Sequence, residues 1–203
     1  MNFVFLIISL VLISGFVGSA LAQPMTVEKE ISSEEIEKMK NTAVLITMND
    51  GTFMIQLFPE DAPNTVKNFL ELVESGFYDG IVFHRIIPNF MIQAGDPNTA
   101  GPDSDRSLWG QGGPGYNINE EFNTIQHDRG IVSMARSNHP DSAGSQFFIV
   151  HKDNNQLDGK YTVFGRLVPG MPQALDKIAS LPTNNANQPL DASRATITKT
   201  SII

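Results

Sequence analysis

The residues with the clearest chemical potential lie between Phe83 and Asp96, where Arg85 stands close to Phe90, Met91 and Gln93. Arginine stays protonated and presents several N–H donors in a fixed plane. Side chains alternate between the two faces of a strand, so Arg85 and Gln93 can share a face if the segment is extended. A guanidinium held beside apolar side chains, away from water, can polarise a neutral polar group. The segment therefore predicts a site that acts on an amide-like group.

Nucleophilic hydrolysis has weaker support in the sequence. Ser145 lies in Gly144-Ser145-Gln146, which lacks the Gly-x-Ser-x-Gly pattern of a nucleophile elbow. The members of a catalytic triad meet only in space, so Ser145 with a histidine and an aspartate stays open as a distant alternative.

Metal and cofactor sites are not indicated either. The chain has no cysteine, and its four histidines do not follow a metal-binding spacing. The run Gly110–Gly115 lacks the Lys-Ser/Thr of a phosphate-binding loop and predicts a turn with positive φ angles. Glu120 and Glu121 adjoin Phe122 and are typical of loop or strand-edge charges rather than of a glycosidase pair. We therefore expect no metal and no cofactor. The histidines are His84, His127, His139 and His151.

Short strands separated by glycine and proline turns are expected to position these residues. The sequence Asn49-Asp50-Gly51 is a hairpin signal between two apolar runs. From Pro63 to Ser75, apolar residues recur at spacings of three and four, which predicts a helix that ends at Gly76. A second helix is expected from Met171 to Ser180. Many short strands with two helices indicate a closed antiparallel barrel or a sandwich, and the pattern alone does not choose between them. The expected strands are Ala43–Met48, Thr52–Phe58, Ile81–Ile87, Met91–Ala94, Ile131–Ala135, Gln146–Val150, Thr162–Leu167 and Ala195–Ile202.

The N-terminal residues 1–22 are predicted to be a cleaved signal peptide. Residues 3–22 carry no charge and end in the small-x-small pattern Ala20-Leu21-Ala22. This run is also just long enough to span a bilayer, so a retained membrane tether is the alternative. For residues 23–41 we expect a polar, solvated linker, with a short helix capped by Ser32 and Glu35 as the alternative. The protein is then expected outside the cytoplasm, secreted or anchored to the outer face of the membrane.

The charge of the chain limits its partners. The 203 residues carry a formal net charge of −8, and every charged residue follows residue 22. An acidic surface argues against nucleic acid and anionic lipid as partners. Without cysteine no disulfide forms, so stability must come from the core of one domain, residues 42–203.

Four sequence blocks resemble the cyclophilins, a family of peptidyl-prolyl cis–trans isomerases. They follow one another at the spacing of that family, and the similarity runs from about Thr42 to Ile203. The resemblance implies a mainly β fold, a closed eight-stranded antiparallel β-barrel capped by two α-helices. Because a barrel of this size is packed inside, the substrate groove is expected on its outer face. The blocks are Phe83-His84-Arg85-Ile86-Ile87-Pro88 with Phe90-Met91-x-Gln93, Gly130-Ile131-Val132-Ser133-Met134-Ala135, Gly144-Ser145-Gln146-Phe147-Phe148-Ile149, and Leu157-Asp158-Gly159-Lys160-Tyr161-Thr162-Val163-Phe164-Gly165.

The resemblance also implies a role for each matching residue. Arg85 would be catalytic, and Gln93 and Gln146 would orient the peptide. Ala135 and the backbone of Arg136 would bind the residue before proline, and Gly110 would border the adjoining pocket. Adjacent residues of a strand face opposite sides, so Phe147 would be the core member of its pair. The proline pocket would be formed by Phe90, Met91, Phe148 and Leu157.

The chain departs from well-studied cyclophilins in four places. The Trp that the family links to cyclosporin binding is Gln156 here. A His that follows Gly-Lys is Tyr161, which keeps a ring and a donor and which we include among the substrate-binding residues. The Asn after Met-Ala is Arg136, which adds charge. The loop from Pro97 to Trp109 is longer than in compact members, and Trp109 would either cover the groove or play a structural part.

The function that the resemblance implies is isomerisation of X-Pro bonds. The predicted location outside the cytoplasm adds that the substrates would be exported polypeptides, whose folding the protein would assist. The partners would be proline-containing peptides and unfolded proteins, and we expect a monomer. The alternative is a module that binds proline-containing peptides as a chaperone with little or no turnover.

Overall fold

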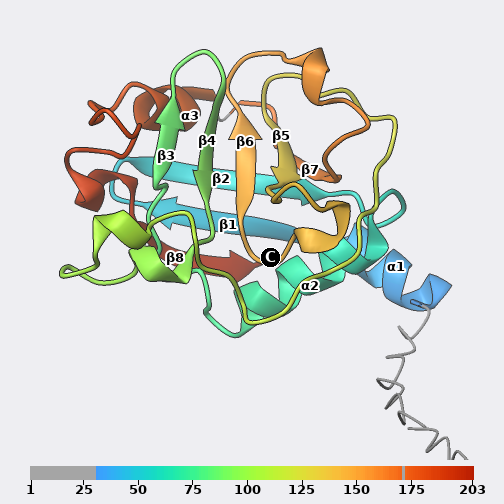
Figure 1. Cartoon of the computed structure of the whole chain (residues 1–203). Coiled ribbons are helices and arrows are strands. Elements are labelled where there is room, and N and C mark those ends of the chain that lie inside the picture. Colours follow the sequence, from blue (N-terminus) through green and yellow to red (C-terminus); the bar gives the residue numbers. More distant parts are fainter. Residues whose placement is uncertain (1–30, 171) are drawn as a thin grey trace, which may run out of the picture. The chain divides into compact units, whose positions relative to one another are not determined.

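The computed structural model describes residues 31–170 and 172–203 (Figure 1). The predicted signal peptide or tether at residues 1–22, and residues 23–30 of the predicted linker, lie outside the described residues. In the part of the chain that the structure describes, no helix is both long and apolar enough to cross a membrane.

Eight antiparallel strands form one sheet, in the order β3-β4-β6-β5-β7-β2-β1-β8. Each of the eight strands predicted from the sequence is present, with ends shifted by up to four residues. In Figure 1, β3, β4, β6 and β5 run across the strands β2, β1 and β8, which lie behind them. The strands are β1 (Ala43–Met48), β2 (Gly51–Leu57), β3 (Arg85–Ile87), β4 (Met91–Ala94), β5 (Ile131–Met134), β6 (Phe147–Val150), β7 (Val163–Leu167) and β8 (Ile197–Ile202).

The sheet is an open half-barrel, so the prediction of a closed barrel is wrong. The edge strands β3 and β8 do not pair with each other in the described sheet. Single backbone hydrogen bonds cross the gap instead: Phe83 N–H donates to Ala195 O at 2.9 Å, and Gly80 N–H donates to Ile197 O at 2.7 Å. On the short strand β3, Ile86 N–H donates to Asn187 O at 2.8 Å, so a loop takes the place of a neighbouring strand.

In the described part of the chain, three α-helices accompany the sheet, where the sequence predicted two. The first is α1 (Ser33–Lys40), which begins with a complete capping box between Ser32 and Glu35. The short helix that the sequence left open as the alternative for residues 23–41 is thus present at Ser33–Lys40. The other helices are α2 (Pro63–Glu74) and α3 (Pro172–Ala179).

Helix α2 lacks a side-chain cap of its own, and a distant carboxylate takes that part. Glu121 Oε2 accepts the backbone N–H of Thr65 at 2.8 Å, and Glu121 Oε1 accepts that of Asn64 at 3.0 Å. A negative charge at a helix N-terminus is favourable because the first N–H groups have no partner in the helix. Glu121, which the sequence predicted to be a loop or strand-edge charge, thus connects the loop that contains it to the N-terminus of α2.

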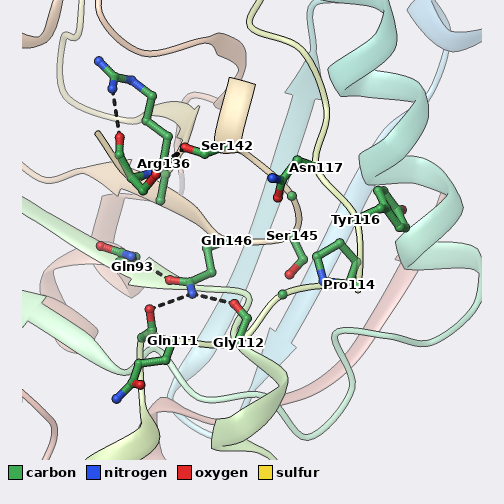
Figure 2. A pocket seen from close by; sticks show the side chains of 16 residues that line it. Gln93, Gln111, Gly112, Pro114, Tyr116, Asn117, Arg136, Ser142, Ser145 and Gln146 are labelled. Atoms are coloured by element: carbon green, nitrogen blue, oxygen red, sulfur yellow. Dashed lines mark hydrogen bonds between the residues drawn. The ribbon is translucent and has the colours of Figure 1, made fainter. Parts of the chain in front are cut away.

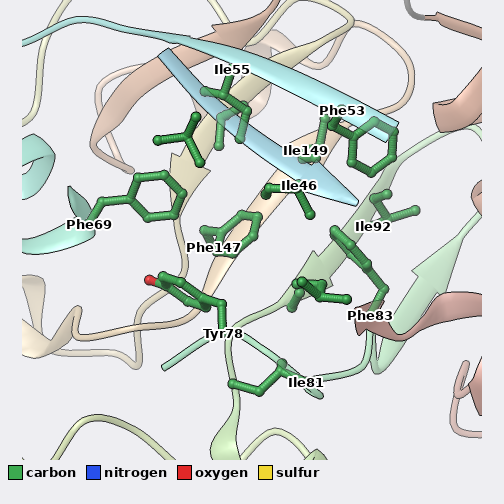
Figure 3. Packing of buried hydrophobic residues seen from close by; sticks show 14 of the residues in the cluster. Ile46, Phe53, Ile55, Phe69, Tyr78, Ile81, Phe83, Ile92, Phe147 and Ile149 are labelled. Atoms are coloured by element: carbon green, nitrogen blue, oxygen red, sulfur yellow. The ribbon is translucent and has the colours of Figure 1, made fainter. Parts of the chain in front are cut away.

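The main core fills the concave side of the half-barrel, and aromatic rings dominate it (Figure 3). Phe147 is fully buried there, with its ring centre 5.5 Å from that of Phe69 on α2. Phe69 also contacts Phe164 of β7 at 5.0 Å. A second, separate cluster lies around Phe148 and Met91, on the opposite face of β4 and β6. Strand parity therefore divides the pair as predicted: Phe147 belongs to the core and Phe148 to the outer face.

The edge strand β8 is tied down by a carboxylate whose effect depends on pH. Asp79 Oδ1 accepts Thr200 N–H at 2.8 Å, and its Oδ2 lies 2.7 Å from Lys199 Nζ. Burial alone would raise the pKa of Asp79, but the bonds to Lys199 and Thr200 outweigh it and lower the pKa below the usual 3.8. A carboxyl with a lowered native pKa stabilises the fold above its unfolded pKa and loses that effect as the pH falls through the native value.

We therefore expect Asp79→Asn to lower the free energy of unfolding at neutral pH by about 0.5–1 kcal/mol, the size of a surface ion pair. The difference from the wild type should vanish as the pH falls below 3.8 and through the native pKa of Asp79. Urea unfolding at several pH values measures this. An equal difference at neutral and at strongly acidic pH would contradict the assignment.

Candidate peptide-binding site

A small cavity on the outer face of the sheet brings together nine of the eleven residues that the sequence singled out. Its volume is about 110 Å³. Strands β3 and β4 and the turn between them supply one side, and β6 with the loops after β5 and before β7 supply the other. The placement agrees with an outer-face groove, and the role of each residue stays a prediction. The lining residues are Arg85, Phe90, Met91, Gln93, Ala135, Arg136, Phe148, Leu157 and Tyr161.

Arg85 faces this cavity from the first position of β3. It is the direct cross-strand partner of Gln93 on β4, so the two side chains share a face through strand pairing and not along one strand. Arg85 Nη1 donates to Gln93 Oε1 at 3.3 Å and lies 3.9 Å from Met91 Sδ. Burial lowers the pKa of Arg85, with nearby Tyr161 opposing, but a guanidinium stays protonated at neutral pH. Within residues 31–170 and 172–203, no carboxylate forms an ion pair with Arg85. Its charge is therefore available to a bound ligand.

A chain of amide hydrogen bonds fixes the position of Gln93 (Figure 2). Gln93 Nε2 donates to Gln146 Oε1 at 2.9 Å. Gln146 Nε2 in turn donates to Gly112 O at 2.8 Å and to Gly110 O at 3.1 Å. The fully buried Asp96 accepts the backbone N–H of Gly110 and so holds this loop in place. The two glutamines are thus oriented before any ligand binds.

A larger cavity of about 640 Å³ adjoins the small one and shares Gln93, Ala135 and Arg136 with it. The predicted residues Gly110 and Gln146 line this second cavity. The glycine run forms the turn expected from the sequence, since φ is +90° at Gly110 and +93° at Gly115. Beyond Gly110, sequence reasoning did not identify the rest of this run as a cavity wall. It also missed Tyr116, Asn117, Ser137 and Ser142, which line the same cavity.

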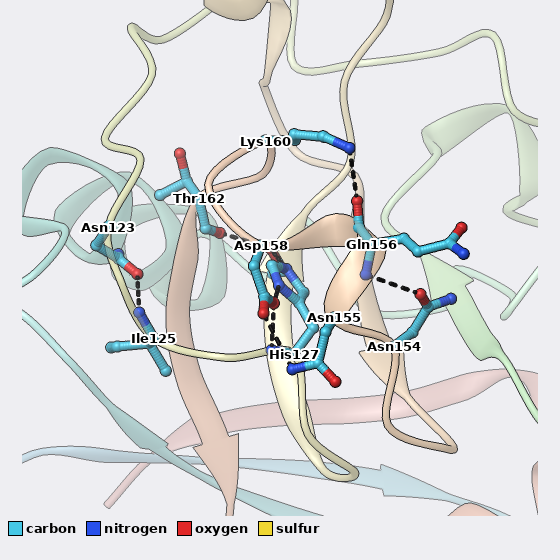
Figure 4. Close-up of polar contacts among 10 residues, drawn as sticks. Asn123, Ile125, His127, Asn154, Asn155, Gln156, Asp158, Lys160 and Thr162 are labelled. Atoms are coloured by element: carbon cyan, nitrogen blue, oxygen red, sulfur yellow. Dashed lines mark hydrogen bonds and ion pairs between the residues drawn. The ribbon is translucent and has the colours of Figure 1, made fainter.

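A polar network around His127 lies against Phe148, and Figure 4 shows the contact of His127 with Asp158. The ring of His127 lies parallel to that of Phe148, with ring centres 6.0 Å apart. His127 Nδ1 lies 2.9 Å from Asp158 Oδ1, and Nε2 lies 3.2 Å from Ser133 Oγ. Because Asp158 directly follows the cavity residue Leu157, this network also ties the loop before β7 to strand β5. No spacing of residues in the sequence indicated this network.

The same network tests the hydrolytic alternative. Ser133, His127 and Asp158 stand in the order of a catalytic triad, but Ser133 is fully buried and its hydroxyl donates to Thr162 O at 2.8 Å. The serine that the sequence suggested, Ser145, is 1 % exposed and donates to Gly95 O at 2.7 Å. A substrate cannot reach either hydroxyl, so the geometry does not favour a serine hydrolase.

Arg136 uses its charge to shape the wall of the small cavity. Its guanidinium lies 4.9 Å from the centre of the Tyr161 ring, and Nε donates to Lys160 O at 2.8 Å. Figure 2 shows the side chain turned away from Gln146. The ring of Tyr161 meets that of Phe148 edge to face at 5.6 Å. Arg136, which the sequence predicted to add charge to the groove, therefore packs on Tyr161 and stabilises the aromatic side chains that line the cavity.

The other two departures from the family pattern lie outside both cavities. Gln156 is exposed, in a short 3₁₀ turn from Asn155 to Leu157. Trp109 is 9 % exposed and belongs to the main core, with the guanidinium of Arg106 4.6 Å above its ring. The two alternatives for Trp109 were to cover the groove or to play a structural part, and the structural part is confirmed. Among the residues that the structure describes, no cluster of three or more metal-ligating side chains occurs.

An eight-stranded antiparallel half-barrel, with an arginine at a small cavity on its outer face that apolar and amide side chains also line, defines a cyclophilin-like protein. A model of the family described as cyclophilin type peptidyl-prolyl cis-trans isomerase/CLD matches residues 43–202. The chain belongs to this family, and the prediction from the four sequence blocks is confirmed.

Individual relatives agree with the family assignment. A probable peptidyl-prolyl cis-trans isomerase of Brucella suis is 40 % identical over 168 residues, which cover 80 % of this chain and 85 % of the relative. A crystal structure of a Cryptosporidium parvum cyclophilin type peptidyl-prolyl cis-trans isomerase, solved in the presence of the dipeptide Ala-Pro, has a TM-score of 0.70 and 34 % identity. It covers 79 % of this chain and 98 % of that one.

A third relative is much longer than this chain. The peptidyl-prolyl cis-trans isomerase-like 2 protein of Cryptococcus neoformans is 43 % identical over 160 residues, which cover 74 % of this chain. This chain spans only 27 % of the length of that relative, and 31 % of a protein of the same name from Gibberella zeae.

Proposed function

We propose that this protein is a peptidyl-prolyl cis–trans isomerase that acts on X-Pro bonds of exported polypeptides. The observation that carries the proposal is Arg85, a guanidinium without a carboxylate partner in the described chain, at a 110 Å³ cavity that apolar side chains such as Met91 and Phe148 also line. The cavity has the size and lining for a proline ring, and Gln93 and Gln146 stand beside it to receive the peptide backbone.

The proposed mechanism follows from the electronic structure of the amide. A peptide bond resists rotation by about 18–20 kcal/mol because the nitrogen lone pair is delocalised into the carbonyl. Rotation about the X-Pro bond returns this lone pair to the prolyl nitrogen. A donor aimed at that nitrogen then binds the twisted state more strongly than either planar isomer, which lowers the barrier. Arg85 is suited to this role because a hydrogen bond from Nη1 to Gln93 orients its guanidinium, which is partly desolvated.

Binding of the proline ring completes the mechanism. Phe148, Met91 and Leu157 would anchor the ring while the preceding carbonyl rotates. The apolar wall excludes water from the donor and so strengthens its hydrogen bond. No covalent bond forms, and no proton is transferred.

The assay that tests this proposal is NMR exchange spectroscopy on a capped Ala-Pro peptide. Uncatalysed exchange takes tens to hundreds of seconds, so catalysis is read directly as exchange cross-peaks at substoichiometric protein. Binding of the peptide without accelerated exchange would replace the isomerase by the alternative, a binding module without turnover. Absence of both binding and exchange would refute both functions.

The location is a separate part of the proposal. The uncharged run of residues 3–22 and the Ala20-Leu21-Ala22 pattern support export, after which slow X-Pro isomerisation would limit the folding of the clients. N-terminal sequencing of the native protein tests it. A start at Gln23 is expected, whereas an intact Met1 on protein in the cytoplasmic fraction would contradict export.

A further inference from the structure

Phe90, which lines the small cavity, is the last residue of a tight turn in which one backbone N–H has no partner within the turn. Phe90 N–H donates to Ile87 O at 3.1 Å, which closes a four-residue turn between β3 and β4. Pro88 occupies the second position, and Asn89 at the third has a φ of +60°. Proline followed by a residue with positive φ is the pattern of a type II turn. The turn does not use the N–H of Asn89, which needs a partner elsewhere.

That partner is His151, which follows β6 directly. His151 Nδ1 accepts the Asn89 N–H at 2.9 Å, and the backbone N–H of His151 donates to Phe90 O at 2.8 Å. On the other side of the ring, Nε2 lies 2.9 Å from Asp176 Oδ1 on α3. A ring that accepts at Nδ1 and donates at Nε2 is the neutral imidazole with its proton on Nε2.

We propose that His151 is a positioning residue of the isomerase site, which holds the Asn89–Phe90 turn against the proline pocket only while its ring is neutral. This inference rests on the proposed function and concerns the regulation of the same site. A proton on Nδ1 would set two donors, Nδ1–H and Asn89 N–H, against each other at 2.9 Å. The bond to Asn89 would break, and Phe90 would keep its own backbone bonds to Ile87 and His151. The turn would then be held less firmly, and the affinity for X-Pro peptides would fall in mild acid.

The charges around His151 decide which of its two bonds is lost. Asp176 on α3 stabilises the protonated ring, so the Nε2 bond survives. Arg129, from the loop before β5, opposes this effect because its Nη2 shares Asp176 Oδ1 at 2.8 Å. Asp153 Oδ1 accepts the Arg129 N–H at 2.7 Å, and Lys152 follows His151 in the chain. The turn itself carries no charged side chain from Ile86 to Gln93. Protonation of His151 therefore breaks the bond to Asn89, the residue next to Phe90 of the small cavity.

The test compares kcat and KM for a capped Ala-Pro peptide, which has no titratable group, at about pH 8 and about pH 5.5, a range over which histidine changes charge. For the wild type we expect KM to rise by about 2–10-fold at the lower pH, the effect of one hydrogen bond, with a smaller change in kcat. In His151→Asn the side-chain oxygen can accept from Asn89 at both pH values, so KM should stay low. His151→Leu offers no acceptor, so KM should be high at both.

A matched control is available in His139, whose Nδ1 accepts the N–H of Asp141 at 3.2 Å within its own turn, away from Phe90. His139→Asn should keep the acid rise of the wild type. The inference is overturned if His151→Asn keeps that rise, if His139→Asn abolishes it, or if His151→Leu has the KM of the wild type near pH 8.

A second readout does not depend on activity. In the wild type, the amide resonance of Asn89 should shift with the same midpoint as the His151 ring, and this shift should be absent in His151→Asn. An Asn89 amide that does not respond to the protonation of His151 overturns the inference. Wild-type protein without any isomerase activity would instead refute the proposed function, and the amide titration distinguishes the two failures.

Discussion

Replacement of Arg85 by alanine is expected to slow the catalysed exchange of an X-Pro bond by about 10²–10³-fold, the effect of removing one preorganised donor. Within the described residues, the guanidinium bonds only to Gln93 and to the sulfur of Met91, so its loss should leave the fold intact. Gln93 keeps its bond to Gln146, and the other eight side chains that line the small cavity stay in place. The loss should therefore fall mainly on kcat, measured by NMR exchange on a capped Ala-Pro peptide, with the dissociation constant of the peptide little changed.

Two further variants separate the charge from the geometry of Arg85. Arg85→Lys keeps a cation but lacks the planar set of donors, so we expect most of the activity to be lost. Arg166→Ala removes a guanidinium from β7 that bonds to Gln56 at 3.1 Å, outside both cavities, and should leave exchange unchanged. A folded Arg85→Ala variant that exchanges the peptide at the wild-type rate would exclude Arg85 from the mechanism.

The strands and the outer-face site could be predicted because they depend on local pattern. Alternation along β6 separates Phe147 from Phe148, and the Asn49-Asp50-Gly51 signal gives the hairpin in which Met48 pairs with Gly51. The order of the four family blocks then identified nine residues that meet in one small cavity.

Features that depend on contacts distant in sequence could not be predicted in this way. Closure of the sheet would require β3 to pair with β8. The N–H of Ile86 on β3 donates to Asn187 O instead, and no local sequence pattern predicts that contact. The charge density of residues 33–40 is typical of a linker, so the sequence favoured a linker over a helix there. In the fold, the capping box and the ion pairs Glu35–Lys67 and Lys40–Glu60 stabilise helix α1. The link from Asp176 through His151 to Asn89 joins three segments that only the fold brings together.

The adjacent residues Phe147 and Phe148 should respond to the same substitution in opposite ways. Phe147→Ala removes a fully buried ring that packs on Phe69 and Phe83, so we expect it to lower the free energy of unfolding by about 3–5 kcal/mol. Phe148→Ala empties a site at the edge of the groove, where water can fill the space, so the loss of stability should be smaller, about 1–3 kcal/mol.

Peptide binding should show the reverse order. Phe148 forms the floor of the small cavity between His127 and Tyr161, and without its ring a proline buries much less apolar surface. We expect KM for a capped Ala-Pro peptide to rise by about 10–100-fold in Phe148→Ala, the value of one buried apolar side chain. Phe147→Ala, assayed below its melting temperature, should keep a KM close to that of the wild type. Urea unfolding and exchange kinetics on both variants measure the two effects. If Phe148→Ala loses stability like Phe147→Ala while its KM stays unchanged, the outer cavity is only a part of the core and the proline ring binds elsewhere.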